Sequence, residues 1–450
     1  MSQTIDVGDL LDRSSWSSYQ KLLTLLVAIA VVFDGFDIQI LGFAIPSLMD
    51  EWKVARADFG FVLAVGLVGM TVGGPLAGYY GDRFGRRTTL IVCVLTFALA
   101  TIATAFIEGI VGLTVLRLLT GIGAGGALPN VTALTAELAP VRMRSMAVKL
   151  TIVCVPLGGM LGGLLAAQIL PRYGWRGLYL VGGALPLLFA VVLWAYLPES
   201  PRFLVSRRES WPQLARLLTR IGHTIPAGAS FASREEAERG ERPSLSGLFS
   251  SGLARDTVGL WGAFFFSLGF NYLVMGWLPA LLVAEGLDLE VAVSGLATFN
   301  LGGVLGVLVW SVLVTKLGTR GPVLSGALAC AGGALAVSAA PVEAHGHPVA
   351  LLVCIGVTGL FAGAVQASLY ALAAHVYPTA MRATGVAYSA AVGRAGGLLS
   401  SLVGASLIQA GGGTFWYTLA IAMVCTFLGL AWVKSHYAVA RVDAIRATGI

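Results

Sequence analysis

The sequence predicts an all-α membrane protein with twelve transmembrane helices, arranged as two related bundles of six. Two features of the composition lead to this prediction: hydrophobic residues make up 57% of the 450 residues, and charged residues make up only 12%. Soluble domains carry about 25% charged residues, so this chain lacks the polar surface to face water all round. The apolar residues also fall into blocks of about 20 residues, the length that a helix needs to cross a bilayer.

Twelve such blocks follow one another, and each justifies one expected helix. The expected spans are 22–48, 59–80, 88–107, 111–136, 147–170, 176–197, 255–284, 292–315, 321–340, 348–376, 384–410 and 414–434. An N-terminal bundle with its tail (1–197) and a C-terminal bundle with its tail (255–450) flank a central cytoplasmic loop (198–254). Apolar residues at helical spacing in this loop predict an amphipathic helix on the membrane surface. They are Trp211, Leu214, Leu217, Leu218 and Ile221.

Lys and Arg residues predict the orientation. The loops and tails on the side shared by both termini carry 23 of them, and the opposite side carries four. Positive residues concentrate on the cytoplasmic side, so we expect a multi-pass protein of the cell (inner) membrane with both termini in the cytoplasm. Arg117 and Arg394 instead fall inside spans. A charge there costs about 2.5–3.5 kcal/mol on insertion scales unless it is paired or hydrated.

The two halves repeat a pattern. Ala-Glu-x-x-Pro-x-x-Met-Arg at 136–144 recurs as Ala-His-x-x-Pro-x-x-Met-Arg at 374–382, and Pro46 has a counterpart in Pro279. Repeated six-span halves are the architecture of transporters whose site lies at the interface between the halves. A channel or a membrane enzyme rarely needs this duplication.

The loop after the second span reads Gly-x-x-x-Asp-Arg-Phe-Gly-Arg-Arg over 78–87. The glycines predict a tight turn, and Asp82 is expected against a neighbouring helix N-terminus, where the dipole favours a carboxylate. The arginines are expected to meet anionic headgroups, and a generic positive loop is the alternative interpretation. In the second half Thr315 replaces the acid.

This loop resembles the signature loop of the major facilitator superfamily, which implies the major facilitator fold and a conformational latch that does not contact substrate. The expected latch residues are Gly78, Asp82, Arg83, Gly85, Arg86, Arg87, Glu137 and Arg144. Span 4 agrees with this resemblance, because Arg-x-x-x-Gly-x-Gly-x-Gly-Gly over 117–126 is similar to a superfamily pattern whose arginine is linked to proton coupling. Each glycine taken singly is better explained by helix packing.

The first span contains two acids three residues apart, Asp34 and Asp37, which share one helix face. Two like charges that are close and poorly solvated disfavour full ionisation, so the pair can hold one proton near neutral pH. Counting from the outer end places Arg117 nearer to Asp37 than to Asp34. We therefore expect Asp34, Asp37 and Arg117 to couple transport to protons, while a structural ion pair with Arg117 is the alternative; both can hold.

The segment Asp-Gly-Phe-Asp at 34–37, followed by Gly42 and Pro46, resembles the aromatic acid:proton symporter family. That family places an arginine of span 11 at the substrate site, and Arg394 matches this position. Arg394 lies near mid-depth among glycines that we expect to open space, and a guanidinium is a natural bidentate partner for a carboxylate. The alternative is a structural pair with a buried acid, but the C-terminal spans contain no other acid at mid-depth.

Other polar and aromatic residues near mid-depth are weaker candidates for the substrate site, because aromatic residues inside spans more often pack than bind. The candidates are Gln39, Asn271, Tyr272, Trp277, Asn300 and Gln366.

We therefore expect a proton-coupled secondary transporter, acting as a monomer, that imports a benzoate-like or hydroxybenzoate-like aromatic carboxylate by alternating access. Symport of a dicarboxylate or a nicotinate-like acid is the near alternative, and a membrane receptor signalling through 198–254 is a more distant one. The sequence shows no nucleophile–base set, metal cluster or phosphate-cradling loop. We therefore expect that the protein is not an enzyme and that it uses no cofactor or metal. The net charge of +6 is explained by orientation and not by a nucleic-acid partner.

Overall fold

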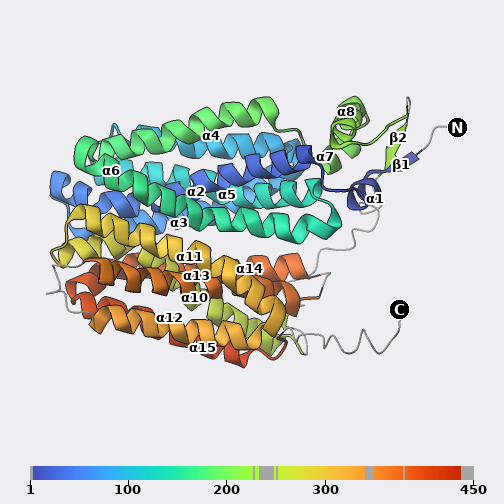
Figure 1. Cartoon of the computed structure of the whole chain (residues 1–450). Coiled ribbons are helices and arrows are strands. Elements are labelled where there is room, and N and C mark those ends of the chain that lie inside the picture. The colour runs from blue at the N-terminus through green and yellow to red at the C-terminus, as the bar shows by residue number, and fades with distance from the viewer. Residues whose placement is uncertain are drawn as a thin grey trace. The chain divides into compact units, whose positions relative to one another are not determined.

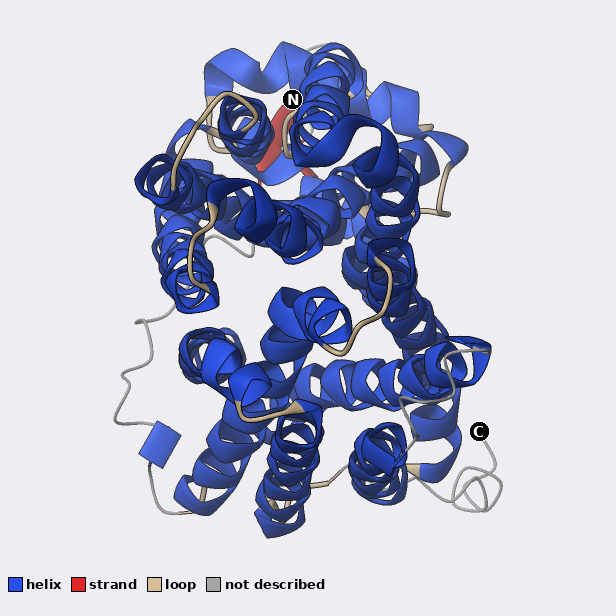
Figure 2. Cartoon of the chain, turned by 90° about the vertical axis from the view of Figure 1, so that its left-hand side faces the viewer, coloured by secondary structure: helices blue, strands red, loops and turns tan. Residues whose placement is uncertain are grey.

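The computed structural model describes residues 4–226, 229–232, 248–249, 252–339, 348–378 and 381–436. Helices account for nearly all of this described part (Figures 1 and 2). The chain forms two compact units. Unit 1 comprises Met1–Ala44, Val65–Leu165 and Ile169–Glu241, and unit 2 comprises Ile45–Ala64, Ala166–Gln168 and Arg242–Ile450.

The first half of the chain contains five long apolar helices. They are α2 (Ser18–Trp52), α3 (Arg56–Phe84), α4 (Arg86–Thr104), α5 (Ile110–Leu138) and α6 (Val141–Tyr196). Helix α6 is 56 residues long, but Gly174 interrupts it with φ 64° and ψ −173°. The helix therefore carries two spans, and this break falls between the two that the sequence predicts there.

The second half contains six long apolar helices. They are α10 (Ala254–Ala284), α11 (Leu289–Leu317), α12 (Arg320–Ala339), α13 (Pro348–Val376), α14 (Arg382–Gln409) and α15 (Gly412–Trp432). In the described part of the chain, eleven helices are long and apolar enough to span a membrane. Since α6 contains two spans, the twelve predicted helices and the all-α fold are confirmed.

Close packing of α2 on α6 positions the acidic pair. A Cβ atom at Gly35 would lie 2.1 Å from the carbonyl oxygen of Val155, and one at Gly158 would lie 2.0 Å from that of Val32. Only glycine permits these two backbones to approach so closely. Asp34 and Asp37 therefore sit on a helix that is fixed against its neighbour.

Short elements from the N-terminal tail and the central loop form a small domain that we call the cap. It consists of β1 (Thr4–Asp6), α1 (Val7–Asp12), α7 (Pro201–Val205), η1 (Arg208–Ser210), α8 (Trp211–Ile221) and β2 (Ser230–Ala232). Strands β1 and β2 pair in parallel, with Ile5 opposite Phe231. The N-terminal tail is thus bound to a loop more than 200 residues further along the chain.

The apolar face of α8 lies inside the cap. Leu214, Leu217, Leu218 and Ile221 are at most 5% exposed. They pack with Val7 and Leu11 of α1, Leu204 and Val205 of α7, and Phe231 of β2. The prediction that this face lies on the membrane surface is therefore wrong. An amphipathic pattern indicates only that one face of a helix avoids water, and in α8 other segments of the chain cover that face.

Leu217→Ala is expected to loosen the cap by removing buried contacts, at a cost of about 2–5 kcal/mol. Limited proteolysis of the purified protein should cleave the central loop faster in this variant. Gln213→Ala is the matched control, because Gln213 lies on the exposed face of the same helix. Equal cleavage rates in the two variants would contradict the buried placement of Leu217.

Candidate functional site

Asp37 is held by two neighbouring helices in unit 1. It is 3% exposed. Its Oδ1 atom accepts a hydrogen bond from Thr101 of α4, and its Oδ2 atom lies 3.8 Å from Nη1 of Arg117 of α5. The same Nη1 donates to the backbone carbonyl of Asp37 at 3.1 Å. The structure thus places Arg117 against Asp37, the acid that the depth count put nearer to it.

Arg117 has a second partner in the latter part of α6. Its Nη2 donates to the hydroxyl of Tyr179 at 3.1 Å, and its guanidinium lies 5.7 Å from the centre of the Tyr179 ring. The Trp175 ring packs edge-on against this tyrosine. Thr101 and Tyr179 were not among the predicted site residues, although a polar side chain inside an apolar span is a signal that points to both.

Asp34 lies one helical turn before Asp37 and is 1% exposed. It is within electrostatic range of the Cys93 thiol of α4. Arg117, in contrast, forms an ion pair with Asp37. Gln39 is also buried, and it donates weakly to the carbonyl of Gly35 at 3.5 Å.

In unit 2, polar side chains of α10 and α13 form a connected group. Ser267 donates from Oγ to Oε1 of Gln366 at 3.1 Å, and Asn271 donates from Nδ2 to the same oxygen at 3.3 Å. Asn271 also donates to the backbone carbonyl of Ser267 at 2.8 Å. The structure therefore brings together two predicted substrate residues, Asn271 and Gln366, and adds Ser267 to them.

Arg394 is partly buried on α14 and lies within electrostatic range of Tyr370 of α13. Among the described residues, the structure records no hydrogen bond or ion pair for its guanidinium. We had expected the neighbouring glycines to open space around Arg394, but they do not. A Cβ at Gly396 would lie 2.0 Å from the carbonyl oxygen of Phe265, because these glycines let α14 lie directly against α10.

Three other predicted substrate residues make contacts with neighbouring helix groups. The ring of Trp277 is fully buried, and its Nε1 donates to the carbonyl of Ser401 at 3.1 Å, so it is not available to stack on a ligand. Asn300 is buried and donates to the carbonyl of Leu296 in its own helix at 2.8 Å. The Tyr272 ring covers Gly397, where a Cβ would lie only 2.4 Å from it.

The predicted latch residues form an ion-pair network at the ends of α3, α4 and α5. Arg86 donates from Nε to Glu137 at 2.9 Å and from Nη2 to Asp82 at 3.0 Å. Glu137 also accepts a hydrogen bond from the hydroxyl of Ser200. Arg86 is therefore engaged in protein contacts and does not face headgroups.

The carboxylate at the N-terminus of α4 belongs to Glu199. Its Oε1 atom accepts from the backbone N–H of Arg87 at 2.9 Å, at the helix end where the dipole favours a negative charge. We had expected Asp82 at a helix N-terminus, but its recorded contact is the ion pair with Arg86. The sequence does not reveal that Glu199 takes the place expected for Asp82, because Glu199 is more than 110 residues away from Arg87 along the chain.

The remaining latch arginines bind nearby groups of the same unit. Arg83 donates to the hydroxyl of Tyr79 at 3.1 Å, and Arg87 donates to the carbonyl of Trp194. Arg144 forms an ion pair with Asp12 of the cap, with 2.6 Å between Nη2 and Oδ1.

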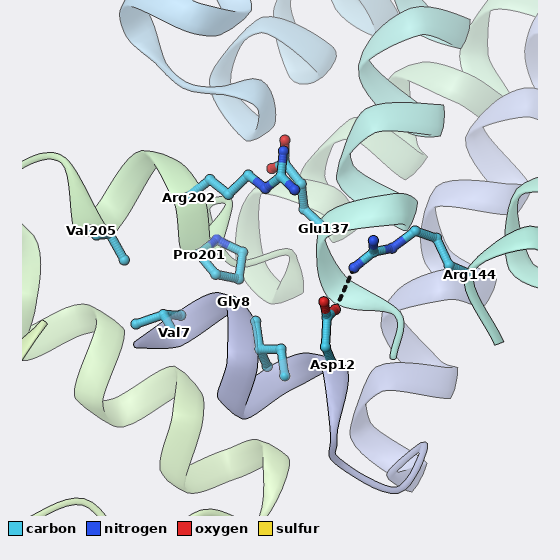
Figure 3. Close-up of a pocket in the computed structure, with 9 residues that line it drawn as sticks. Val7, Gly8, Asp12, Glu137, Arg144, Pro201, Arg202 and Val205 are labelled. Carbon is cyan, nitrogen blue, oxygen red and sulfur yellow. Dashed lines mark hydrogen bonds and ion pairs between the residues drawn. The ribbon is translucent and has the colours of Figure 1, made fainter. Parts of the chain in front are cut away.

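This Asp12–Arg144 pair borders a small pocket between the cap and the latch (Figure 3). The pocket is lined by Val7, Gly8, Leu11, Asp12, Glu137, Arg144, Pro201, Arg202 and Val205. Asp12 and Val7 come from the N-terminal tail, whereas Glu137 belongs to the ion-pair network of Arg86. The cap is therefore attached directly to the predicted latch residues.

Gly85 and Gly78 share one motif but differ in what they tolerate. Gly85 adopts φ 100°, and a Cβ there would lie 2.2 Å from Oε2 of Glu199. Gly78 lies inside α3, not in the turn where we expected it, and a Cβ there meets no atom of the described residues within 4 Å. Gly85→Ala should therefore destabilise the loop by about 1–3 kcal/mol, whereas Gly78→Ala should be neutral or stabilise by up to about 1 kcal/mol. Thermal unfolding in detergent measures both, and equal shifts would contradict the role of Gly85.

Comparisons with known proteins agree over nearly the whole chain. A model of the Major Facilitator Superfamily matches residues 27–342 and 260–446. The gallate transporter of Pseudomonas putida is 38% identical over 95% of this chain and 92% of its own length. The 4-hydroxybenzoate transporter PcaK of Pseudomonas putida is 34% identical over 91% of each chain. A crystal structure of a D-xylose-proton symporter superposes with a TM-score of 0.74 at 20% identity, covering 93% of this chain and 99% of its own, which shows a shared fold.

Proposed function

The chain belongs to the major facilitator superfamily, and within it to the aromatic acid:proton symporter family, and from this membership we propose that it imports an aromatic carboxylate together with protons. It is a multi-pass membrane transporter. Its relatives are named for gallate and 4-hydroxybenzoate, and we propose a substrate of the same class. The protein acts as a monomer in the inner membrane with both termini in the cytoplasm.

The observation that carries the proposal is the environment of the Arg394 guanidinium. Its guanidinium lies partly buried in an apolar span, with no recorded ion pair among the described residues. A charge in such a place is costly unless it is compensated. A carboxylate offers two oxygens to the planar guanidinium, which is the strongest form of this pairing. The substrate carboxylate therefore binds Arg394, beside the hydroxyl of Tyr370.

Proton coupling is assigned to the buried acids of unit 1. Asp37 is held by the hydrogen bond from Thr101 and the ion pair with Arg117. We assign the transported proton to Asp34, the other buried acid on the same face of α2.

The network of Asp82, Arg86 and Glu137 is proposed to act as the conformational latch. It joins the ends of three helices through one guanidinium. Breaking it changes the rate of exchange between conformations and leaves the substrate site of unit 2 in place. The cap takes part through the Asp12–Arg144 pair.

Reconstitution into proteoliposomes tests the proposed function. Labelled 4-hydroxybenzoate, gallate, benzoate, nicotinate and succinate would be supplied separately, with a pH gradient alkaline inside. We expect the benzoate-type acids to accumulate and a protonophore to abolish the accumulation. Uptake of succinate or nicotinate without the benzoates would identify a different acid, and binding without uptake would identify a receptor. Uptake that ignores the gradient would exclude proton coupling.

A further inference from the structure

We propose that Gln366 recognises a hydroxyl group on the substrate ring, so that the site prefers hydroxylated benzoates to benzoate. This inference rests on the proposed function, because it assumes an aromatic carboxylate whose acid group is bound by Arg394. The relatives described above are named for hydroxylated acids, gallate and 4-hydroxybenzoate, but these names do not say which residue recognises the hydroxyl group.

Hydrogen bonds fix the orientation of the Gln366 amide. Asn271 turns its Nδ2 atom toward the backbone carbonyl of Ser267 at 2.8 Å, so the atom that faces Gln366 is a donor. The hydroxyl of Ser267 donates to Gln366 as well. Two donors converge on one atom of the Gln366 amide, and that atom must be the oxygen. The amide nitrogen, with two N–H groups, is consequently directed away from both.

This nitrogen has no recorded hydrogen-bond partner. The Nε2 atom of Gln366 is buried, and among the described residues no acceptor lies within bonding distance. A buried donor without an acceptor costs free energy, whereas the oxygen of the same amide is satisfied twice over. The unsatisfied side is therefore the one that a bound molecule completes.

Gln366 shares one face of α13 with Tyr370, which follows it by four residues, about 6 Å along the helix axis. Arg394 lies within electrostatic range of Tyr370. The proposed carboxylate partner and the free amide donor are thus associated with successive turns of one helix face. A ring whose carboxylate binds Arg394 would present a substituent at its opposite end to Gln366.

An N–H donor distinguishes the two kinds of substrate directly. A phenolic oxygen accepts a hydrogen bond from the amide, while the C–H group at the same position of benzoate cannot. Binding of benzoate leaves the buried donor unsatisfied, and such a loss corresponds to about tenfold or more in affinity. A hydroxyl next to the carboxylate, as in 2-hydroxybenzoate, lies at the other end of the ring and gains little from Gln366.

The test is the ratio of dissociation constants for benzoate and 4-hydroxybenzoate, measured by calorimetry on the full-length protein in detergent. Gln366→Met keeps the length of the side chain and removes both donors. We expect the preference of the wild type for 4-hydroxybenzoate to fall about tenfold in this variant, while the ratio of 2-hydroxybenzoate to benzoate hardly changes. Gln366→Asn withdraws the amide by one methylene group. Its preference for 4-hydroxybenzoate should lie between those of the wild type and Gln366→Met.

Ser368→Ala is the matched control on the same helix. The Ser368 hydroxyl is buried like the Gln366 amide nitrogen, but it donates to the carbonyl of Ala364 in its own helix, so the ratio should stay as in the wild type. An unchanged ratio in both Gln366→Met and Gln366→Asn would overturn the inference while leaving the proposed function intact. If the wild type binds none of these acids, the proposed function itself fails.

Discussion

Arg394→Ala is expected to abolish measurable binding of benzoate-like acids, and Arg394→Lys to restore it only in part. Removing one partner of a buried, hydrogen-bonded charge pair costs about 2–5 kcal/mol, which is roughly 30-fold or more in affinity. Lysine keeps the positive charge, but it presents a point charge and cannot match both carboxylate oxygens with a planar fork. Affinity should therefore follow the order Arg, Lys, Ala.

Calorimetric titration of purified variants with 4-hydroxybenzoate measures this order. Arg382→Ala is the control, since Arg382 belongs to the same helix but is exposed at its first turn. It should retain binding after losing the same charge. Ordinary affinity in Arg394→Ala would move the carboxylate site away from α14 and with it the basis of the proposed function.

The helices of this protein were predictable because each needs only a local pattern. An apolar block long enough to cross a bilayer becomes a helix whatever its neighbours are. Even the break in α6 at Gly174 was visible as a polar interval between two apolar blocks. The pairing of Arg117 with Asp37 followed from depth alone, since both residues lie in spans whose ends are known.

Features that depend on the partner of an element were missed. The pattern of α8 shows an apolar face, but it cannot say whether lipid or the N-terminal tail covers that face. The same holds for Trp277, whose midspan position makes it a candidate for the substrate site but which is fully buried and bonded to α14. The helix N-terminus that we assigned to Asp82 is a third case, because the carboxylate that lies there belongs to Glu199. These outcomes are decided by packing between segments far apart in the sequence.

The proposed proton site and the proposed carboxylate site belong to different units, and they use opposite charges. In unit 1 a buried arginine is compensated by Asp37 and Tyr179. In unit 2 Arg394 has no recorded ion pair among the described residues, and we propose that the substrate carboxylate compensates its charge. An intramembrane arginine needs one or the other. A carboxylate is recorded beside Arg117 but, in the described part of the chain, none beside Arg394, and for this reason we propose a coupling role for the first and a binding role for the second.

Asp37→Asn and Asp34→Asn are both expected to stop accumulation driven by a pH gradient, but for different reasons. Asp37→Asn leaves the buried charge of Arg117 without its carboxylate, and breaking a buried pair in this way costs about 3–5 kcal/mol. This variant should therefore also unfold at a clearly lower temperature. Asp34→Asn removes the proposed proton carrier without breaking that ion pair, so its thermal stability should change less. Substrate exchange without a gradient should survive in Asp34→Asn.

Parallel assays of gradient-driven uptake, exchange and thermal unfolding separate these effects. Asp50→Asn is the matched control, because Asp50 lies on the same helix but is exposed and paired with Lys53 near the helix end. It should transport and unfold like the wild type. Loss of both uptake and exchange in Asp34→Asn would give Asp34 a part in substrate binding or in the conformational change itself. Full gradient-driven uptake in both Asp34→Asn and Asp37→Asn would remove the proton role from this pair, because a side-chain amide cannot carry the proton that a carboxylate carries, and Arg117 and Asp37 would then serve only to hold α2 and α5 together.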